Sequence, residues 1–299
     1  MMAARITSGF DGELLRNEPM SRHTSWRIGG PAEIFFRPAN VEDLSRFLRT
    51  LAPETPVFWF GLGSNLLVRD GGLSGVVIAT SGIFTHLEKI GEYRVRAGAS
   101  VPCTLLARQC IRWGFGPAEF FAGIPGTLGG ALAMNAGAHG NETWERVDTV
   151  RTIDRHGETH ARTPADYRIG YRRVDGPRDE WFIEADLQFD PGAPASMDTL
   201  KEMLARRKDT QPLGLPSCGS VFRNPPGDFA ARLIESCGLK GARIGDAEVS
   251  EKHANFIINR GDASALDVEN LILHVQQTVA DASGIELVPE VRIVGKEAS

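Results

Sequence analysis

The chain has 299 residues, of which 42% are hydrophobic and 24% charged, and this length and composition are typical of a globular protein with two or three domains. Its formal net charge of −5 argues against nucleic acid as a general partner, because neutralising phosphates requires a basic surface. No segment resembles a membrane span or the apolar core of a signal peptide, so we expect a cytoplasmic protein without membrane insertion. The cysteines and histidines lack metal-ligand spacing, and we expect no metal site.

The N-terminal part of the chain alternates between helical and strand-like patterns. Asn40 is a suitable N-cap for a helix, because apolar residues follow at spacings of three and four: Val41, Leu44, Leu48 and Leu51. Short apolar or alternating runs predict strands at 57–60, 76–79 and 93–97. A helix is predicted from Pro102 to Trp113, ending at Gly114.

The C-terminal half predicts strands first and mostly helices later. Residues 149–189 are typical of strands and turns, and 181–185 form the clearest strand. The run Pro191-Gly192-Ala193-Pro194 predicts a linker, so we place a domain boundary after residue 195. Helices are predicted at 197–208, at 229–237 before Gly238, and around Val268, Ile272, Val275 and Val279, opened by Asp262 or Ser264, with a last strand at 286–294. Helices and strands mixed without regular βαβ spacing predict an α+β fold.

Residues 123–140 form the most informative stretch, being rich in glycine with mostly small or apolar residues between. We expect neither an ordinary core strand nor a core helix there, because interior glycines lose more backbone entropy than alanine. Clustered amide groups without Cβ atoms are well suited to bind phosphate or pyrophosphate. The stretch therefore predicts a site for a dinucleotide cofactor.

A second glycine-bearing loop, Gly61-Leu62-Gly63-Ser64-Asn65, follows the predicted strand 57–60, as a phosphate loop should. It lacks the third glycine of GxGxxG, and the chain has no GKS or GKT for a P-loop. A plain turn is the structural alternative for this loop taken alone. Two such loops outside the Rossmann pattern favour a flavin-binding fold of another type.

Several motifs occur together in chain order. They are Gly61-Leu62-Gly63-Ser64-Asn65-Leu66-Leu67, the run 123–140, Cys218-Gly219-Ser220-Val221-Phe222-Arg223-Asn224-Pro225, the runs 238–245 and 249–256, and Pro289-Glu290-Val291-Arg292. From about residue 24 to 295 the chain thus resembles the UDP-N-acetylenolpyruvoylglucosamine reductases, flavoenzymes of peptidoglycan precursor synthesis. The short span between Arg172 and Trp181 resembles the subfamily that lacks an extra substrate-capping insertion.

The resemblance implies an architecture and a reaction. It implies an FAD-binding region of the vanillyl-alcohol-oxidase/PCMH type at 1–195, in two subdomains of about 1–80 and 81–195. A C-terminal α+β substrate-binding domain at 196–299 follows, with the last strand, about 286–295, returning to the first subdomain. The implied reaction is the reduction of UDP-N-acetylglucosamine enolpyruvate to UDP-N-acetylmuramate by an FAD-containing enzyme that uses NADPH.

The resemblance also implies that the two glycine loops hold FAD. The residues assigned to FAD are Gly61, Gly63, Ser64, Asn65 and Leu66 in the first loop and Gly123, Ile124, Pro125, Gly126, Thr127, Gly129, Gly130, Asn135, Ala136 and Gly137 in the second.

The implied chemistry needs a fixed cation. A hydride from flavin N5 adds to the alkene, and negative charge develops on the neighbouring carbon and the carboxylate. Arg172 is the expected cation, because Ile169-Gly170-Tyr171-Arg172 resembles the family's aromatic-Gly-Tyr-Arg motif, whose tyrosine we assign to the substrate. Arg168 is the competing assignment, and a surface arginine is the structural alternative. Val174 departs from the family, which usually has a serine at that position.

A proton donor and a carboxylate complete the predicted catalytic group. The resemblance makes Ser220 the donor to the enolate carbon, although Gly219-Ser220-Val221 alone would indicate a turn. Glu290 is expected to polarise the enolpyruvyl group together with Arg172, and an exposed strand glutamate is its alternative. Further substrate contacts are expected from Arg223, Asn224 and Lys208, the last with a solvated helix face as the alternative.

Two other functions remain open from the sequence. One is a flavin oxidase or dehydrogenase of the same fold acting on a hydroxy acid or a sugar alcohol. The other is a non-catalytic protein that binds nucleotide sugars, in which the long glycine run would have no evident purpose.

Overall fold

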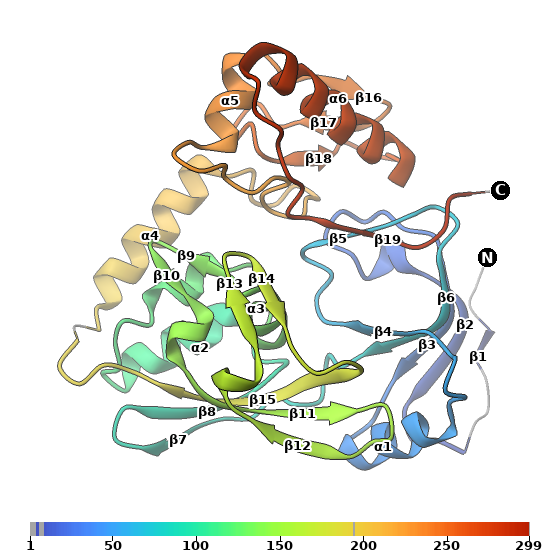
Figure 1. The fold of residues 1–299 in the computed structure, drawn as a ribbon, viewed down its shortest axis with the longest axis vertical. Coiled ribbons are helices and arrows are strands. Elements are labelled where there is room, and N and C mark those ends of the chain that lie inside the picture. Colours follow the sequence, from blue (N-terminus) through green and yellow to red (C-terminus); the bar gives the residue numbers. More distant parts are fainter. Residues whose placement is uncertain (1–3, 6–8, 194, 299) are drawn as a thin grey trace.

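The computed structural model describes residues 4–5, 9–193 and 195–298, so Pro194 of the predicted linker lies outside the described residues. Two sheet-based bodies lie side by side, and a third body built around a long helix lies above them (Figure 1). The sheets are largely antiparallel, and the helices are not interleaved regularly with the strands. The predicted α+β fold is therefore confirmed.

The first body is a five-stranded sheet with one helix. Its strands follow the order β1 (Ala4–Arg5), β2 (Glu13–Pro19), β3 (Pro31–Arg37), β6 (Leu73–Ala79) and β4 (Val57–Phe60). Helix α1 (Val41–Thr50) begins where it was predicted, because the Asn40 side chain accepts a hydrogen bond from the Asp43 amide. Its buried Leu44 and Leu48 pack in the core beside the sheet.

The second body contains an antiparallel sheet with helices on one side. The strands follow the order β12 (Thr159–Arg162), β11 (Val147–Asp154), β15 (Glu180–Gln188), β8 (Arg94–Gly98) and β7 (Leu87–Gly91). The predicted strands 93–97 and 181–185 correspond to β8 and β15. Helix α2 (Cys103–Arg112) begins after Pro102, and its apolar face lies in the core with Phe120 and Phe121.

The expectation that residues 123–140 form neither a core strand nor a core helix is wrong. The run includes α3 (Leu128–Met134) and β9 (Gly137–Ala138), which forms a short hairpin with β10 (Asn141–Glu142). Glycine is tolerated in α3 because its backbone lies against the sheet: a Cβ on Gly129 would come within 3.0 Å of the Ala99 Cβ. The helix ends at Asn135, which has the left-handed conformation with φ 45° and ψ 51°.

The third body consists of two helices and a small sheet. It contains α5 (Ala230–Ser236), β16 (Arg243–Ile244), β17 (Ala247–Val249), β18 (Ile257–Asn259) and α6 (Ala265–Ser283). Of the two predicted N-caps, Ser264 begins α6, in a capping box with Asp267. The four valine and isoleucine residues that predicted this helix are all buried in the core.

Two segments connect the third body to the others. Helix α4 (Met197–Thr210) leads into it, while Leu200 of α4 is buried in the core of the second body. Trp26, from the segment between β2 and β3, is fully buried in the core of the third body. Its indole Nε1 donates to the Ile257 carbonyl at 2.7 Å, and its carbonyl accepts from Asn259 Nδ2 at 3.1 Å.

The predicted final strand at 286–294 is wrong in its length. Only β19 (Arg292–Val294) is a strand, and it pairs in parallel with β5 (Leu66–Val68) of the N-terminal region. Upstream, the Glu290 amide donates to the Val221 carbonyl in the third body at 2.7 Å. Because this segment crosses from one body to another, it cannot remain in a single sheet. The crossing places Glu290 between the bodies.

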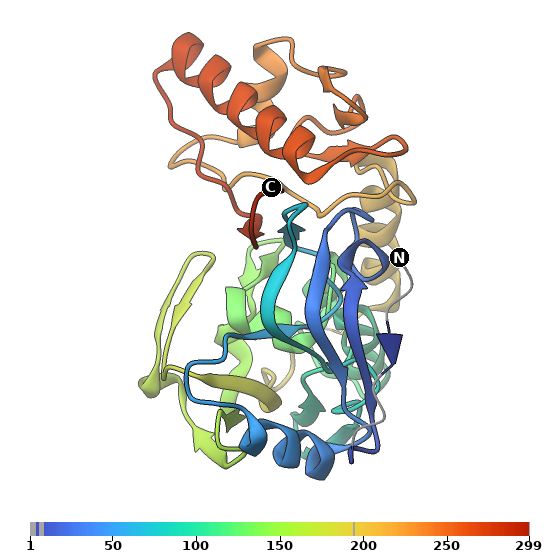
Figure 2. The ribbon, with the colours of Figure 1, turned by 90° about the vertical axis from the view of Figure 1, so that its right-hand side faces the viewer.

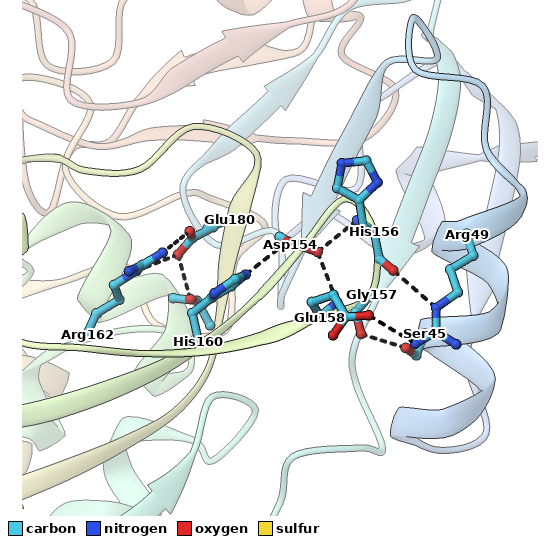
Figure 3. Close-up of polar contacts among 10 residues, drawn as sticks. Ser45, Arg49, Asp154, His156, Gly157, Glu158, His160, Arg162 and Glu180 are labelled. Atoms are coloured by element: carbon cyan, nitrogen blue, oxygen red, sulfur yellow. Dashed lines mark hydrogen bonds and ion pairs between the residues drawn. The ribbon is translucent and has the colours of Figure 1, made fainter.

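The first two bodies are also joined far from the third. The turn between β11 and β12 docks on α1, where Ser45 Oγ donates to the Gly157 carbonyl at 2.7 Å and Arg49 Nε to the His156 carbonyl at 3.2 Å (Figure 3). Beside this turn, the Glu180 carboxylate accepts from Thr152 and Arg162. Ile153 of β11 extends the apolar core between the two bodies. These contacts hold the first two bodies together.

Candidate active site

A cavity of about 540 Å³ is lined by residues from all three bodies. The first body contributes the loop after β4, and the second contributes the glycine-rich run and Arg172. Cys218, Gly219, Ser220 and Glu290 line it from the third body and from the crossing segment. Segments remote in sequence therefore enclose one site, large enough for a small organic ligand.

Nearly all of the residues assigned to the cofactor line this cavity. All five from the first loop line the cavity, and so do all from the second loop except Asn135. Asn135 is 1% exposed and points its side chain into the protein.

The two loops approach each other through bare backbone. Ser64 Oγ donates to the Pro125 carbonyl at 3.0 Å and so joins the loops directly. Gly126 has φ +127°, and a Cβ there would lie 2.9 Å from Ser64 Oγ. Gly63 has φ +59°, and a Cβ there would lie 2.9 Å from the His23 carbonyl oxygen. A side chain at either glycine would therefore disturb the cavity wall.

These loops also present free hydrogen-bond donors. Within the described part of the chain, no protein acceptor takes up the amides of Leu62, Gly63 and Ser64 in the first loop or those of Gly126 and Thr127 in the second. Adjacent amides without protein partners are well suited to bind the oxygens of a phosphate or a diphosphate. The loops therefore fit the diphosphate of a dinucleotide.

Arg207, which the sequence analysis did not single out, also lines the cavity. Its Nη1 donates to the Ala122 carbonyl at 3.1 Å and its Nε to Gln211 Oε1 at 3.0 Å. Among the described residues no carboxylate lies within 4.0 Å of it, and burial lowers the pKa of its guanidinium. A buried cation with only neutral partners, beside free amides, favours an anionic ligand.

A helical pattern in the sequence could have identified Arg207. Leu200 and Leu204 pack on the second body, and Arg207 follows at the spacing i, i+4, i+7, so it shares their face. The neighbouring Arg206 and Lys208 lie on the exposed side of α4.

Arg172 and Glu290 form an ion pair at the cavity wall. Arg172 lies at the tip of the hairpin of β13 (Arg168–Gly170) and β14 (Arg173–Asp175), which stands apart from the sheets (Figure 2). Its Nε contacts Glu290 Oε1 at 3.0 Å, and both residues line the cavity. Burial raises the pKa of the Glu290 carboxyl, and the charge of Arg172 opposes this rise. The pair thus presents a fixed cation with a carboxyl group beside it.

The structure distinguishes the two competing arginines. Arg168 is exposed on β13 and does not line the cavity, whereas Arg172 does. Tyr171 is 48% exposed beside it, with the Arg172 guanidinium carbon 4.9 Å from its ring centroid. Val174, where the resemblance leads one to expect a serine, pairs with Ile169 across the hairpin and packs against the core of the second body.

Ser220 lies in the cavity wall on a well-held segment. The next residue, Val221, donates its amide to the Asn255 carbonyl at 2.9 Å, and the Asn255 side chain bridges both backbone groups of Phe222. The Ser220 hydroxyl makes no hydrogen bond to the described residues, so it is available to a ligand. Asn255 was not singled out from the sequence, although it lies in one of the motifs that carry the resemblance.

None of the four residues assigned to the substrate lines the cavity: Tyr171, Arg223, Asn224 and Lys208. Asn224 Oδ1 accepts from the Ala230 amide at 3.1 Å at the start of α5. The positive charge of Arg223 lowers the pKa of the Glu290 carboxyl, but burial raises that pKa by more. Lys208 is exposed, and its carbonyl accepts from Lys252 Nζ.

Comparisons with known proteins agree with this geometry. Two family models match the chain: "UDP-N-acetylenolpyruvoylglucosamine reductase, C-terminal domain" over residues 211–294 and "FAD binding domain" over residues 32–162. A UDP-N-acetylenolpyruvoylglucosamine reductase of Alkalilimnicola ehrlichii is 60% identical over 96% of this chain and 97% of its own length. Another, from Methylococcus capsulatus, is 55% identical, with coverages of 98% and 97%. The crystal structure of the Thermus caldophilus reductase matches with a TM-score of 0.78 and 31% identity, covering 98% of this chain and 99% of that one.

Proposed function

Because the chain belongs to the UDP-N-acetylenolpyruvoylglucosamine reductase family, we propose that Arg172, Ser220 and Glu290 are its catalytic residues. The protein is an FAD-dependent oxidoreductase that reduces UDP-N-acetylglucosamine enolpyruvate, with NADPH as reductant, in peptidoglycan precursor synthesis. The observation that supports the assignment is the convergence of these three residues on the wall that carries the free loop amides.

The two loops and Arg207 would hold the cofactor. The amides of Leu62, Gly63, Ser64, Gly126 and Thr127 have no protein partner in the described residues and would donate to the FAD diphosphate. Arg207 would neutralise part of the diphosphate charge. When bound, FAD supplies the hydride for the carbon–carbon double bond of the substrate.

The remaining steps belong to side chains of the protein. Arg172 would bind the substrate carboxylate and stabilise the negative charge that grows on it and on the adjacent carbon. Ser220 would give its hydroxyl proton to that carbon, because among the described residues no partner competes for its hydroxyl. Glu290, paired with Arg172, would polarise the enolpyruvyl group, and burial favours its protonated form by raising its pKa.

The proposed domain division follows the same roles. Residues 1–195 would bind FAD, in subdomains of about 1–80 and 81–195, and residues 196–299 would bind the nucleotide substrate. Helix α4, whose Leu200 packs on the second body, would be the rigid connection between them. The pairing of β19 with β5 supports a return of the chain end to the first subdomain.

No helix of the described residues has the length and apolar character to cross a membrane. We place the enzyme in the cytoplasm.

A visible spectrum tests the proposed roles. The purified protein should carry a flavin that NADPH bleaches, and UDP-N-acetylglucosamine enolpyruvate should restore the colour. In Ser220→Ala, bleaching should proceed at the wild-type rate while recolouring slows by about 10²–10⁴-fold. Ser81→Ala, at an exposed serine, is the matched control.

Other outcomes contradict specific parts of the proposal. Wild-type recolouring in Ser220→Ala would remove Ser220 as the proton donor. Rapid recolouring by oxygen without any response to the enolpyruvyl nucleotide would indicate a flavin oxidase. A protein that binds UDP-sugar but no flavin would indicate a non-catalytic nucleotide-sugar-binding protein.

A further inference from the structure

The side chain of Asn135 is occupied entirely inside the protein. Its Nδ2 donates to Glu142 Oε2 at 2.6 Å and to the Gly170 carbonyl at 3.1 Å. Its Oδ1 accepts from the Trp144 amide at 3.2 Å. With both ends of the amide engaged and only 1% of the residue exposed, Asn135 has no polar atom left for a cofactor.

The segment around Asn135 also holds Arg172 in position. Gly170 is the last residue of β13, so the Asn135 side chain holds the backbone of the hairpin two positions before Arg172. The Asn135 carbonyl accepts from Arg172 Nη1 at 3.2 Å, and the Gly137 carbonyl accepts from Nη2 at 2.9 Å. Residues 135–137 thus form hydrogen bonds both to the backbone before Arg172 and to the Arg172 guanidinium.

The hairpin has few other supports near its tip. All three residues of β13 are exposed, and Figure 2 shows the hairpin projecting away from the sheets toward the third body. Arg172 itself has φ +54°, a conformation that non-glycine residues rarely adopt without outside constraint. The constraint at this tip comes from Asn135, from the Gly137 carbonyl and from the ion pair with Glu290.

Asparagine satisfies two requirements at this position. The residue ends α3 in the left-handed conformation, which asparagine tolerates better than most residues. The side chain must also donate to Glu142 and accept from Trp144 at once, which only an amide can do here. An aspartate would keep the backbone conformation and the acceptor but would place a carboxylate against that of Glu142.

We propose that Asn135, supported by Glu142, is a positioning residue that fixes Arg172 for the reduction of the substrate. The inference rests on the catalytic role proposed above for Arg172. Asn135 acts on the half-reaction in which charge develops on the substrate, and it leaves FAD binding and reduction by NADPH unchanged. Misplacing a charged group by about 1 Å lowers rates by about 10²-fold.

The test compares two half-reactions in the FAD-loaded enzyme. In Asn135→Asp, bleaching by NADPH should stay within about twofold of wild type, while recolouring by UDP-N-acetylglucosamine enolpyruvate slows by about 10²-fold, mainly in kcat. Adding Glu142→Gln should restore only part of the rate, because the new amide donates to the carboxylate at position 135 while the donor to the Gly170 carbonyl stays lost. Asn141→Ala, in the same short hairpin and outside the cavity wall, should behave as wild type.

Several outcomes would overturn the proposal. Wild-type recolouring in Asn135→Asp, or an equal loss in both half-reactions that Glu142→Gln does not repair, would each reject it. If Asn135→Asp does not fold with FAD, Glu142→Ala decides, since it removes the partner and keeps Asn135: slowed recolouring alone supports the proposal, and unchanged recolouring rejects it. A wild-type enzyme that bleaches but never responds to the enolpyruvyl nucleotide would instead reject the proposed function.

Discussion

The charged residues around the cavity are paired to different degrees. Arg172 has a carboxylate partner, whereas Arg207 has only neutral ones among the described residues. A cation held this way keeps most of its charge available for a ligand, because its hydrogen bonds to carbonyl and amide oxygens do not neutralise it. Arg172 is thus paired with a carboxylate, whereas the charge of Arg207 is available to the anionic ligand proposed above.

Arg207→Gln should weaken FAD binding. A charge-assisted hydrogen bond contributes about 1.5–3 kcal/mol, so the dissociation constant should rise by about 10- to 100-fold. Titration of the apoprotein with FAD, monitored by flavin fluorescence, measures this dissociation constant. Arg206→Gln, on the exposed side of the same helix, is the control. Unchanged FAD affinity with a raised KM for the nucleotide substrate would place Arg207 at the substrate diphosphate instead.

Glu248 predicts a pH dependence of stability in the third body. This buried carboxylate pairs with Arg260 at 2.6 Å and with Arg243, and these hydrogen bonds lower its pKa below the ordinary value of 4.5. A lowered folded-state pKa means that the stabilisation is present above the unfolded pKa and is lost as pH falls through the folded one. Glu248→Gln should cost about 1–3 kcal/mol at pH 7.

The measurement is urea unfolding at several pH values. The difference between wild type and Glu248→Gln should be constant near neutrality and shrink as pH falls below about 4.5. Glu286→Gln, at an exposed glutamate that makes no hydrogen bond within the described residues, should show no such difference. An unchanged difference at low pH would assign the effect to packing and not to the charge.

At the scale of elements, the docking of the β11–β12 turn on α1 holds the first two bodies together. Gly157 has φ +74°, and a Cβ there would lie 2.8 Å from the Ser45 carbonyl oxygen and 3.0 Å from its Cα. Those atoms belong to the α1 backbone and cannot move aside as a flexible side chain can. The turn must therefore separate from α1 to accept any side chain.

Gly157→Ala should lower the free energy of unfolding by about 2–4 kcal/mol, through steric conflict and left-handed strain together. Gly192→Ala is a matched control, because φ is +75° and a Cβ would meet no atom of the described residues within 4 Å. That variant should lose only the strain contribution of about 1 kcal/mol. Denaturant unfolding checks both variants. Equal losses of unfolding free energy in Gly157→Ala and Gly192→Ala would mean that the docking of the turn on α1 contributes nothing to stability.

At the scale of the whole molecule, the cavity wall is assembled from three bodies, so a ligand that fills it should stabilise them jointly. Ligand that binds only the folded state adds about 4 kcal/mol at a concentration 1,000 times its Kd. Removing FAD should therefore lower Tm, and adding it back should restore Tm.

Riboflavin provides the control for this effect. It carries the flavin ring without the diphosphate, so it cannot use the free loop amides or Arg207. Thermal unfolding with each compound should show a large Tm rise with FAD and a small one with riboflavin. Equal rises would argue against the loops as the diphosphate site.

The sequence alone determined those features of this protein that depend on interactions within a few residues. Asn40 and Ser264 are N-caps, and the apolar spacing after each predicts α1 and α6 because capping and amphipathicity act within a few residues. The two glycine loops predicted a phosphate site, since an absent Cβ is visible in the sequence itself. Their meeting across a Ser64–Pro125 hydrogen bond was not visible, because it joins positions 61 residues apart.

Tertiary contacts decided the rest. The motif around Arg172 favoured it over Arg168 only through the family resemblance. Its contact with Glu290 depends on which end of an exposed hairpin faces the cavity, and it joins positions 118 residues apart. The sequence assigned Asn135 to the cofactor, whereas its burial and its contacts with Glu142 and Gly170 turn it toward the protein. The last strand is shorter than its apolar pattern predicts, because the chain there crosses between bodies and can pair with β5 only after the crossing. Such outcomes depend on distances between remote segments, which only the folded chain defines.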